Sequence, residues 1–375
     1  MKIAVTGFRG IPASWGGVEH HCEQIYSRLA AKGHEIVIYA RSGYVTKDVR
    51  TYKGMRIVRL PTINTKHAEA FVHTFLALLH IIVKTNPDIV HIHAQGPAMF
   101  SWIPRLFRPR MTVFFTCHGR DWERGKWTGW ASRIIRLGEI CSTVFPHYRI
   151  MVSKELQTYY RNRYGAESFY IPNGVRAPTN RAPEIIRKYG LAARDYFLFV
   201  GRIVPEKRLE DTIRAYLSKK RNSKLVVVGE IADTQNYRES LDKVAGSNPD
   251  ICFVGYQYAE ALEEFFSNAR AFVNASELEG LPLTVLEALS YGVPCIISDI
   301  APHREIAEHA NGLLYTTGEV DALSRRMDEI EAMDESELQA CARKTVSAVQ
   351  EHYNWDAAAQ KLERLYRESL GGSAT

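Results

Sequence analysis

Two basic residues follow an apolar run in the second half of the chain. The run covers residues 197–200 and is followed by Gly201, and Arg202 and Lys207 come shortly after that glycine. In open parallel α/β sheets, ligands bind beyond the carboxyl ends of the strands. Arginine offers paired N–H donors and lysine a point charge, so together they can neutralise a diphosphate and stabilise it as a leaving group. The spacing alone is common in solvated loops, so it needs support from other residues.

That support comes from two carboxylates in the segment 277–288. Glu279 follows a predicted strand at 271–273, and Glu287 lies about one turn into the next predicted helix. A carboxylate at Glu287 can accept hydrogen bonds from both hydroxyls of a ribose, and Glu279 can reach the hydroxyls of a hexose. The loop and first helical turn between them offer free N–H groups to phosphate; these residues are Gly280, Leu281, Leu283 and Thr284. An ordinary surface acid would explain Glu287 but not the whole arrangement.

A second possible phosphate site lies near the N-terminus, where Gly16 and Gly17 immediately precede a predicted helix. Glycine amides at a helix N-terminus attract anions, so a diphosphate could bind there. The spacing is not the dinucleotide fingerprint, and Arg41 stands where an NAD-binding protein would carry an acidic residue. The alternative is that these glycines only turn the chain.

Histidines occur in three settings. His118 follows the predicted strand at 113–116, where it could contact a sugar hydroxyl or phosphate, although a structural role is the alternative. His91 and His93 lie within an apolar strand and are expected to be structural. His20 and His21 begin a helix with no third ligand in view, so we predict no metal site.

Short β-branched runs alternate with amphipathic stretches, which predicts an α/β protein of two doubly wound, Rossmann-like domains facing across a cleft. We expect an N-terminal domain at 1–175 and a C-terminal domain at 183–354, joined by the turn-rich segment 172–183. A final helix at about 355–370 is predicted to pack back on the first domain. The predicted strands are 3–6, 36–39, 57–60, 89–93, 113–116, 149–152, 197–200, 225–228, 251–253, 271–273 and 295–298, and helices are predicted at 19–31, 69–84, 335–352 and 355–370.

The net charge of +6 over 375 residues is unevenly distributed. Residues 1–180 carry +14 and the rest −8, so the two halves are expected to face different partners. The six dispersed cysteines predict reduced thiols. The apolar run 71–83 is too short to span a bilayer, and no signal peptide is recognisable at the N-terminus, so we expect a cytoplasmic protein.

Tryptophans and cations also gather between residues 120 and 136. This mixture suits the interface of an anionic membrane, which would place the protein peripherally on the inner face of the cell membrane through Trp122, Trp127, Trp130 and Arg133. Segment 102–110 repeats the pattern. The alternative is that the tryptophans pack within the domain and the cations form a solvated face.

The segments 199–207 and 279–287 resemble those of glycosyltransferase family 4, the retaining transferases of the GT-B fold. Shorter matches extend over nearly the whole chain, at 16–19, 118–119, 152–154, 171–175, 228–229, 253–255 and 291–294. The glycines at 7–17 look more narrowly like the bacterial rhamnosyltransferase-like branch, which extends cell-wall and capsule polysaccharides.

The resemblance implies transfer of a hexose or deoxyhexose from a nucleoside-diphosphate sugar to a saccharide or polyprenyl-diphosphate-linked acceptor, with retention and without metal or other cofactor. The domain at 1–175 would bind the acceptor and the domain at 183–354 the donor. Arg202 and Lys207 would hold the diphosphate, Gly17 would donate to it, and Glu287 would bind the ribose. Glu279 and His118 would contact the transferred sugar. The alternatives are an epimerase or hydrolase of the same fold, or a catalytically silent module that binds sugar nucleotides. Nucleic-acid binding is not expected, because the cations form no recognisable reader module.

Overall fold

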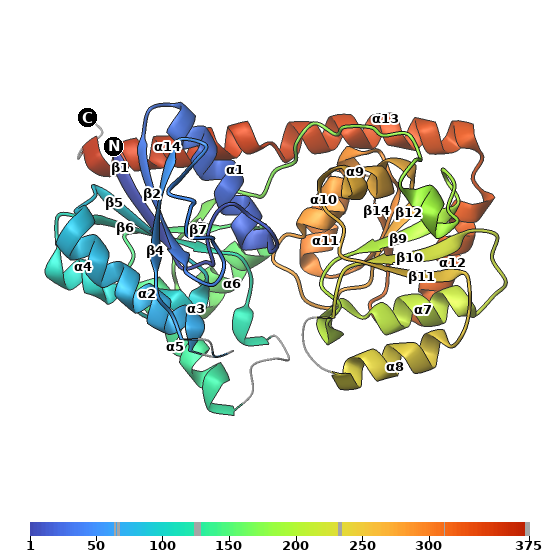
Figure 1. Ribbon diagram of the computed structural model, residues 1–375, viewed down its shortest axis with the longest axis horizontal. Coiled ribbons are helices and arrows are strands. Elements are labelled where there is room, and N and C mark those ends of the chain that lie inside the picture. Colours follow the sequence, from blue (N-terminus) through green and yellow to red (C-terminus); the bar gives the residue numbers. More distant parts are fainter. Residues whose placement is uncertain (64, 66–67, 124–128, 232–234, 311, 372–375) are drawn as a thin grey trace. The chain divides into compact units, whose positions relative to one another are not determined.

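The computed structural model describes residues 1–63, 65, 68–123, 129–231, 235–310 and 312–371, with side chains left undescribed at 129–131 and 235–236. The chain forms two compact units (Figure 1). The first comprises Met1–Asn173 with the C-terminal segment from Trp355, and the second comprises Gly174–Asn354.

The first unit is built on an eight-stranded sheet of order β3-β4-β2-β1-β5-β6-β7-β8. Every pairing is parallel except that of β3 with β4. The central strands β1 and β5 are almost entirely buried, as expected for a parallel sheet covered on both faces. The strands are β1 (Lys2–Thr6), β2 (Glu35–Arg41), β3 (Thr51–Tyr52), β4 (Met55–Leu60), β5 (Ile89–His93), β6 (Thr112–Cys117), β7 (Tyr148–Met151) and β8 (Phe169–Tyr170).

Helices cover both faces of this sheet. They are α1 (Gly17–Ala31), α2 (Glu69–His80), α3 (Gln95–Ala98), α4 (Trp102–Phe107), α5 (Gly129–Val144), α6 (Lys154–Tyr164) and α14 (Trp355–Gly371). The helix predicted at 69–84 ends its α-helical part at His80 and continues as a π-helical turn, Ile81–Thr85. Asn86 closes that turn in the left-handed conformation.

The C-terminal helix α14 packs beside α1 in the first unit (Figure 1). Trp355 and Tyr366 are buried there. Arg28 of α1 pairs with Asp356, and Lys32 pairs with Glu363. The helix predicted at 355–370 therefore corresponds to α14, and its packing depends on aromatic burial reinforced by surface ion pairs.

The second unit has a six-stranded sheet of order β11-β10-β9-β12-β13-β14, in which every pairing is parallel. Its strands are β9 (Tyr196–Val200), β10 (Lys224–Val228), β11 (Ile251–Gly255), β12 (Ala271–Asn274), β13 (Cys295–Ser298) and β14 (Gly312–Tyr315). Its helices are α7 (Leu209–Leu217), α8 (Gln235–Ala245), α9 (Ala259–Asn268), α10 (Leu283–Ser290), α11 (Ala301–Ala307), α12 (Val320–Ala332) and α13 (Glu335–His352).

The division between the units differs from the predicted boundaries by a few residues. We predicted a first domain ending at residue 175 and a second beginning at 183, whereas the second unit begins at Gly174. Val175 explains the difference, because its amide donates to the carbonyl of Tyr353 and its backbone bridges to Asn354. The turn-rich segment is therefore attached to the second unit at its start.

Candidate active site

An ion pair joins two of the predicted donor-site residues in the second unit. Lys207 lies in the short 3-10 turn after β9, and its ammonium contacts the carboxylate of Glu279 in the loop after β12. Both side chains are mostly buried, and the Ser276 hydroxyl donates a further hydrogen bond of 2.8 Å to Glu279. Burial opposes ionisation of Glu279, but Lys207 and His303 hold the pKa of its carboxyl below the ordinary value. The lysine predicted to meet a diphosphate is thus already oriented by a carboxylate.

The loop that carries Glu279 is held by buried polar groups. The side-chain oxygen of Asn274, at the end of β12, accepts a hydrogen bond from the amide of Ser276. The hydroxyl of Ser298, at the end of β13, donates to the carbonyl of Ser276. His303 of α11 contacts Ser298 through Nδ1 at 2.9 Å. These bonds fix the loop against the carboxyl ends of two adjacent strands.

His303 is a residue of this site that the sequence reasoning missed. It is completely buried, and burial lowers its pKa to about 4, so its imidazole is neutral at pH 7. Its Nε2 has no hydrogen-bond partner among the described residues. The only signal in the sequence was its place just beyond β13, on the same sheet edge as Glu279.

Helix α10 presents its N-terminus in the same loop region. It begins at Leu283, after Pro282 in an extended conformation, and no side chain caps it. Four predicted phosphate-binding residues, Gly280, Leu281, Leu283 and Thr284, form the preceding loop and first turn of this helix. The uncapped first-turn amides and the helix dipole favour an anion here.

Glu287 lies one turn further along α10 and is partly buried. Burial raises the pKa of its carboxyl to about 7, although the guanidinium of Arg176 opposes the rise. Strongly shifted pKa values of this kind are common at functional sites, where burial and charged neighbours set the protonation state. Glu287 therefore changes charge close to neutral pH.

Arg202 follows β9 at the point where two strands end in close contact. Gly229, after β10, has a φ of +145°, and a β-carbon there would lie 1.9 Å from the carbonyl oxygen of Gly201. Only glycine allows this approach. The contact sets the course of the chain into Arg202, which is partly buried. Arg202, Lys207, Glu279 and Glu287 thus all belong to the carboxyl-terminal side of the second sheet.

In the first unit, the loop before α1 is held by acidic side chains of that helix. Glu19 accepts from the amide of Arg9 at 3.0 Å, and Glu23 accepts from the amide of Ala13 at 2.8 Å. Gly16 has a φ of +105°, and a β-carbon there would collide with the Glu19 carboxylate. Several loop amides are therefore already occupied. An anion would meet the start of the helix at Gly17, beside a buried carboxylate.

His118, after β6, is connected to a hydrogen-bonded row of buried side chains. Its Nε2 lies 2.9 Å from Nδ1 of His93, whose Nε2 lies 2.7 Å from the hydroxyl of Tyr26. That hydroxyl also contacts His91, which reaches Tyr366 of α14. Burial lowers the pKa values of His91 and His93 well below the ordinary value, so both are neutral. His91 and His93 were predicted to be structural, but their hydrogen-bonded connection to His118 was not predicted.

The prediction that His21 has no third ligand nearby is wrong. One ring nitrogen from each of His21, His93 and His118 lies within 4.8 Å of the others. The helix α1 carries His21 over the ends of β5 and β6, which bring the other two. However, the 2.9 Å between His93 and His118 is a hydrogen-bond distance, whereas two ligands on one zinc ion lie farther apart. Asn173 also holds Nδ1 of His21 at 2.9 Å. The cluster is organised as a hydrogen-bonded network.

The tryptophan-rich segment is described only in part. The indole N–H of Trp122 donates to the buried carboxylate of Glu139, and Arg136 stacks over its ring at 4.5 Å. Trp122 thus belongs to an internal polar network, which matches the alternative of packing within the domain. Trp127 and the side chain of Trp130 lie outside the described residues, and Arg133 is exposed.

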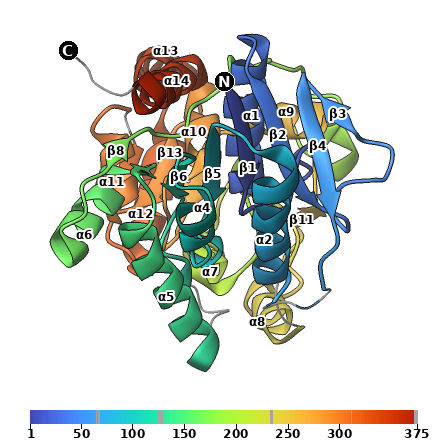
Figure 2. The same ribbon diagram turned by 90° about the vertical axis from the view of Figure 1, so that its left-hand side faces the viewer.

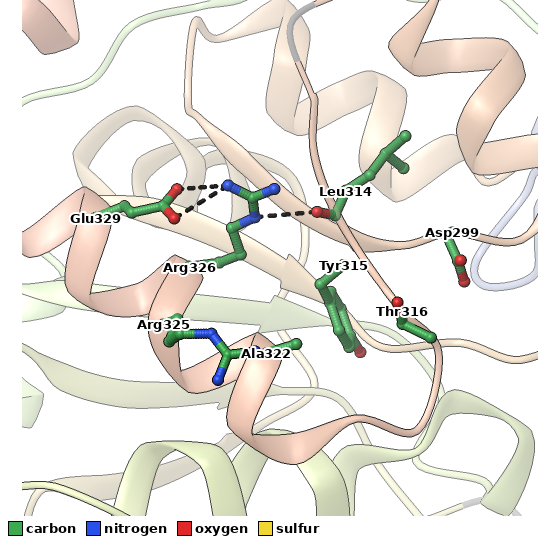
Figure 3. A pocket seen from close by; sticks show the side chains of 8 residues that line it. All are labelled: Asp299, Leu314, Tyr315, Thr316, Ala322, Arg325, Arg326 and Glu329. Carbon is green, nitrogen blue, oxygen red and sulfur yellow. Dashed lines mark hydrogen bonds and ion pairs between the residues drawn. The ribbon is translucent and has the colours of Figure 1, made fainter.

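A pocket of about 400 Å³ lies elsewhere in the second unit, beside β14 and α12 (Figure 3). Arg326 spans it by donating to the carbonyl of Leu314 and pairing with Glu329. None of the predicted site residues lines it; its lining consists of Asp299, Leu314, Tyr315, Thr316, Ala322, Arg325, Arg326 and Glu329. The pocket is therefore separate from the candidate active site.

Two family models cover most of the chain. Residues 15–177 match the Glycosyltransferase Family 4 model, and residues 182–345 match the Glycosyl transferases group 1 model. The chain belongs to glycosyltransferase family 4. Its two Rossmann-like parallel sheets are those of the GT-B fold, so the predicted fold class is confirmed.

Relatives of known description include several glycosyltransferases. The chain is 24% identical to an uncharacterized glycosyltransferase of Methanocaldococcus jannaschii, over 99% of both chains. It is 26% identical to a GDP-mannose-dependent alpha-mannosyltransferase of Mycobacterium tuberculosis, over 86% of this chain and 85% of the relative. A lipopolysaccharide 1,6-galactosyltransferase of Salmonella typhimurium is 33% identical over 33% of this chain and 36% of its own.

Solved structures agree on the fold. Sucrose-phosphate synthase from Thermosynechococcus elongatus superposes with a TM-score of 0.83 at 21% identity, covering 99% of this chain and all of the other. The Anabaena protein HepE, in complex with UDP-glucose, gives a TM-score of 0.80 at 16% identity, covering 97% of this chain and 99% of its own.

Proposed function

We propose that this glycosyltransferase moves a hexose or deoxyhexose from a nucleoside-diphosphate sugar to a saccharide or lipid-linked saccharide acceptor during synthesis of a bacterial-type surface polysaccharide. The observation that carries the proposal is the Lys207–Glu279 pair, which lies in the same loop region as the uncapped N-terminus of α10. A cation and free helix amides suit a diphosphate, while Glu279 and Glu287 suit the hydroxyls on either side of it.

Each residue then has a distinct task. Arg202 and Lys207 neutralise the diphosphate and stabilise the charge that develops as it leaves. Glu279 orients Lys207 and accepts from a hydroxyl of the transferred sugar. The carboxylate of Glu287 accepts from the ribose hydroxyls. In the first unit, Gly17 supplies an amide to the diphosphate and His118 contacts the sugar.

We further propose that transfer proceeds with retention and without a metal ion. A phosphate oxygen of the departing diphosphate removes the acceptor proton on the same face as the new bond. Fixed cations then serve the charge-stabilising purpose that a metal serves in other transferases. The three neighbouring histidines are assigned to sugar contact and hydrogen bonding in this scheme.

The relatives support the polysaccharide context, because one of them is a lipopolysaccharide galactosyltransferase. They differ in the donor that their names imply, and one is described as GDP-mannose-dependent. The glycine-rich N-terminal loop favours dTDP-rhamnose as one candidate, and UDP- and GDP-linked hexoses are the others.

A melting-temperature screen in EDTA tests this function, because a ligand that binds only the folded state raises the melting temperature. The donors are dTDP-rhamnose, UDP-glucose, UDP-N-acetylglucosamine, UDP-galactose and GDP-mannose, with the bare nucleoside diphosphates alongside. A clear rise with one of them is expected. No rise with any donor or diphosphate would contradict the donor site. Release of free sugar without an acceptor would instead favour a hydrolase or epimerase.

A further inference from the structure

The outer face of three helices in the first unit carries a concentration of exposed apolar side chains. These helices are α2 with its π-helical extension, α4 and α5. Of the fifteen large hydrophobic residues exposed among the described residues, nine lie on them. They are Phe75, Leu79, Val83, Trp102, Leu106, Phe107, Leu137, Ile140 and Val144. Such a concentration on about a tenth of the chain indicates an interaction surface.

The spacing of these residues places them on one side of each helix. Phe75, Leu79 and Val83 follow at intervals of four, and Leu137, Ile140 and Val144 at intervals of three and four. The opposite side of α2, with Ala77, Leu78 and Ile81, packs on the sheet in one core cluster with Ile103 of α4. The exposed side chains therefore form a second apolar face that the fold does not use.

The three helices adjoin one another, so their exposed residues can act together. Figure 2 shows α4 between α2 and α5 in front of the sheet. Arg108, after α4, donates to the carbonyl of Ile82 at 2.7 Å, which joins it to the end of α2. The Ser101 hydroxyl lies 3.3 Å from the carbonyl of Cys141, which joins the start of α4 to α5.

The charges around this face are almost all positive. Segments 69–85, 102–110 and 129–144 contain two acidic side chains, of which Glu69 pairs with Arg41 and Glu139 is buried. The cations of the same segments are exposed; they are Lys84, Arg105, Arg108, Arg110, Arg133 and Arg136. An apolar surface with a cationic rim matches an anionic bilayer, where apolar side chains enter the interface and cations meet the headgroups.

We infer that the outer face of α2, α4 and α5 docks on an anionic lipid bilayer. The partner is a lipid surface, because the three helices expose apolar side chains together with six cations, while the two acids of the same segments are paired or buried. This surface shares Arg133 and segment 102–110 with the membrane contact predicted from the sequence, but it does not use Trp122, whose indole donates to Glu139. Among the described residues, no helix is long and apolar enough to cross a membrane, so contact would be at the surface.

Vesicle sedimentation tests the inference with the full chain. The vesicles are phosphatidylcholine alone, or phosphatidylcholine with about a quarter phosphatidylglycerol. We expect binding to the anionic vesicles at low salt, weak binding to the neutral ones, and loss of binding at about 0.5 M salt, where charges are screened. Arg133→Ala and Arg105→Ala should each weaken binding roughly fivefold.

A matched set of variants separates the apolar contribution from charge. Leu106→Glu and Val144→Glu place a carboxylate on the face at residues that are 66% and 62% exposed, so folding should be retained. Leu370→Glu makes the same change at an exposed residue of α14, away from this face. The first two variants should lose vesicle binding and the third should keep it.

Equal binding by all three variants, or absence of binding by the unmodified chain at low salt, would overturn the inference. Light scattering provides a further check. A mass of two chains that falls to one in Leu106→Glu, without vesicle binding, would assign the face to a second copy and would also overturn it. Donor binding by each variant, measured separately, shows whether the proposed function is retained.

Discussion

At the scale of single residues, Glu287 links stability to function. Its carboxyl has a pKa of about 7 in the folded protein, against an ordinary value of 4.5. The protonated form is therefore favoured by folding, and this contribution is lost as the pH rises from the ordinary value through 7. Because ribose hydroxyls need an acceptor, the ionised form present above pH 7 should bind the nucleotide best.

The Glu287→Gln variant tests this link. It should match the unmodified protein in stability near pH 4 and exceed it by about 1 kcal/mol at pH 8, allowing for the partial exposure of the side chain. Urea unfolding at both pH values measures the difference. Nucleotide affinity should rise between pH 6 and 8 in the unmodified protein and stay flat in the variant. A variant with the same pH dependence as the unmodified protein would contradict the assignment.

The Lys207–Glu279 pair makes a second prediction at this scale. Lys207→Ala leaves the Glu279 carboxylate without its cation in a mostly buried place, so we expect a loss of about 3 kcal/mol in the free energy of unfolding. Adding Glu279→Gln should recover part of that loss. The four unfolding curves of this double-mutant cycle measure the coupling, and simple additivity would show that the two groups do not depend on each other.

At the scale of elements, β5 connects the core of the first unit to His118. His93 of this buried strand holds the Nε2 side of the His118 ring at 2.9 Å. We expect His93 to be a positioning residue. In His93→Phe, the maximal transfer rate should fall about tenfold with little change in KM, because one lost hydrogen bond costs roughly that factor. His93→Gln, which keeps a polar side chain, should be faster than His93→Phe but slower than the unmodified protein. Equal rates in the two variants would contradict a positioning role.

The elements that could be predicted from the sequence are those with a strong local pattern. The strand at Ile89–His93 and the helix at Glu335–His352 were predicted with the bounds that the structure has. The strands β3, β8 and β14 were not predicted. The first two have only two residues each and depend on their neighbours, and β14 begins at a glycine, which is unfavourable in strands. The π-helical segment Ile81–Thr85 is a single turn, which is too short to show a period different from that of the preceding α-helix. The sequence therefore predicted one continuous helix over both.

The residues of the candidate site also fall into two groups, those with a local signal in the sequence and those without one. Arg202, Lys207, Glu279 and Glu287 could be proposed from spacing along a few strand ends, whereas His303 and the His21–His93–His118 grouping depend on helix placement. His21 and His93 are far apart in sequence, and only the packing of α1 over β5 brings their rings together. Glu139 is another case, since its four donors come from three separate segments: Gln95 from α3, Trp122 from the turn after β6, and Tyr159 and Tyr164 from α6.

At the scale of the whole molecule, the two units differ in net charge and in exposed apolar surface. The first half of the chain carries +14 and bears the apolar face with its cationic rim. The second carries −8 and holds the predicted diphosphate contacts within an otherwise acidic unit. Arg202 and Lys207 therefore supply two cations to the proposed donor site within a half of the chain whose net charge is negative. The two halves therefore present different net charges to their ligands.

If the cations after β9 hold a nucleoside diphosphate, donor affinity must depend on them, and calorimetric titration of the donor found in the screen measures that dependence. In EDTA, Arg202→Ala and Lys207→Ala should each weaken binding roughly 10- to 100-fold, because each removes a charge-assisted hydrogen bond. Lys219→Ala, which removes an exposed lysine paired with Asp328, is the matched control and should bind normally. Unchanged affinity in both cation variants, or binding that depends on an added divalent metal, would show that these two cations do not hold the diphosphate.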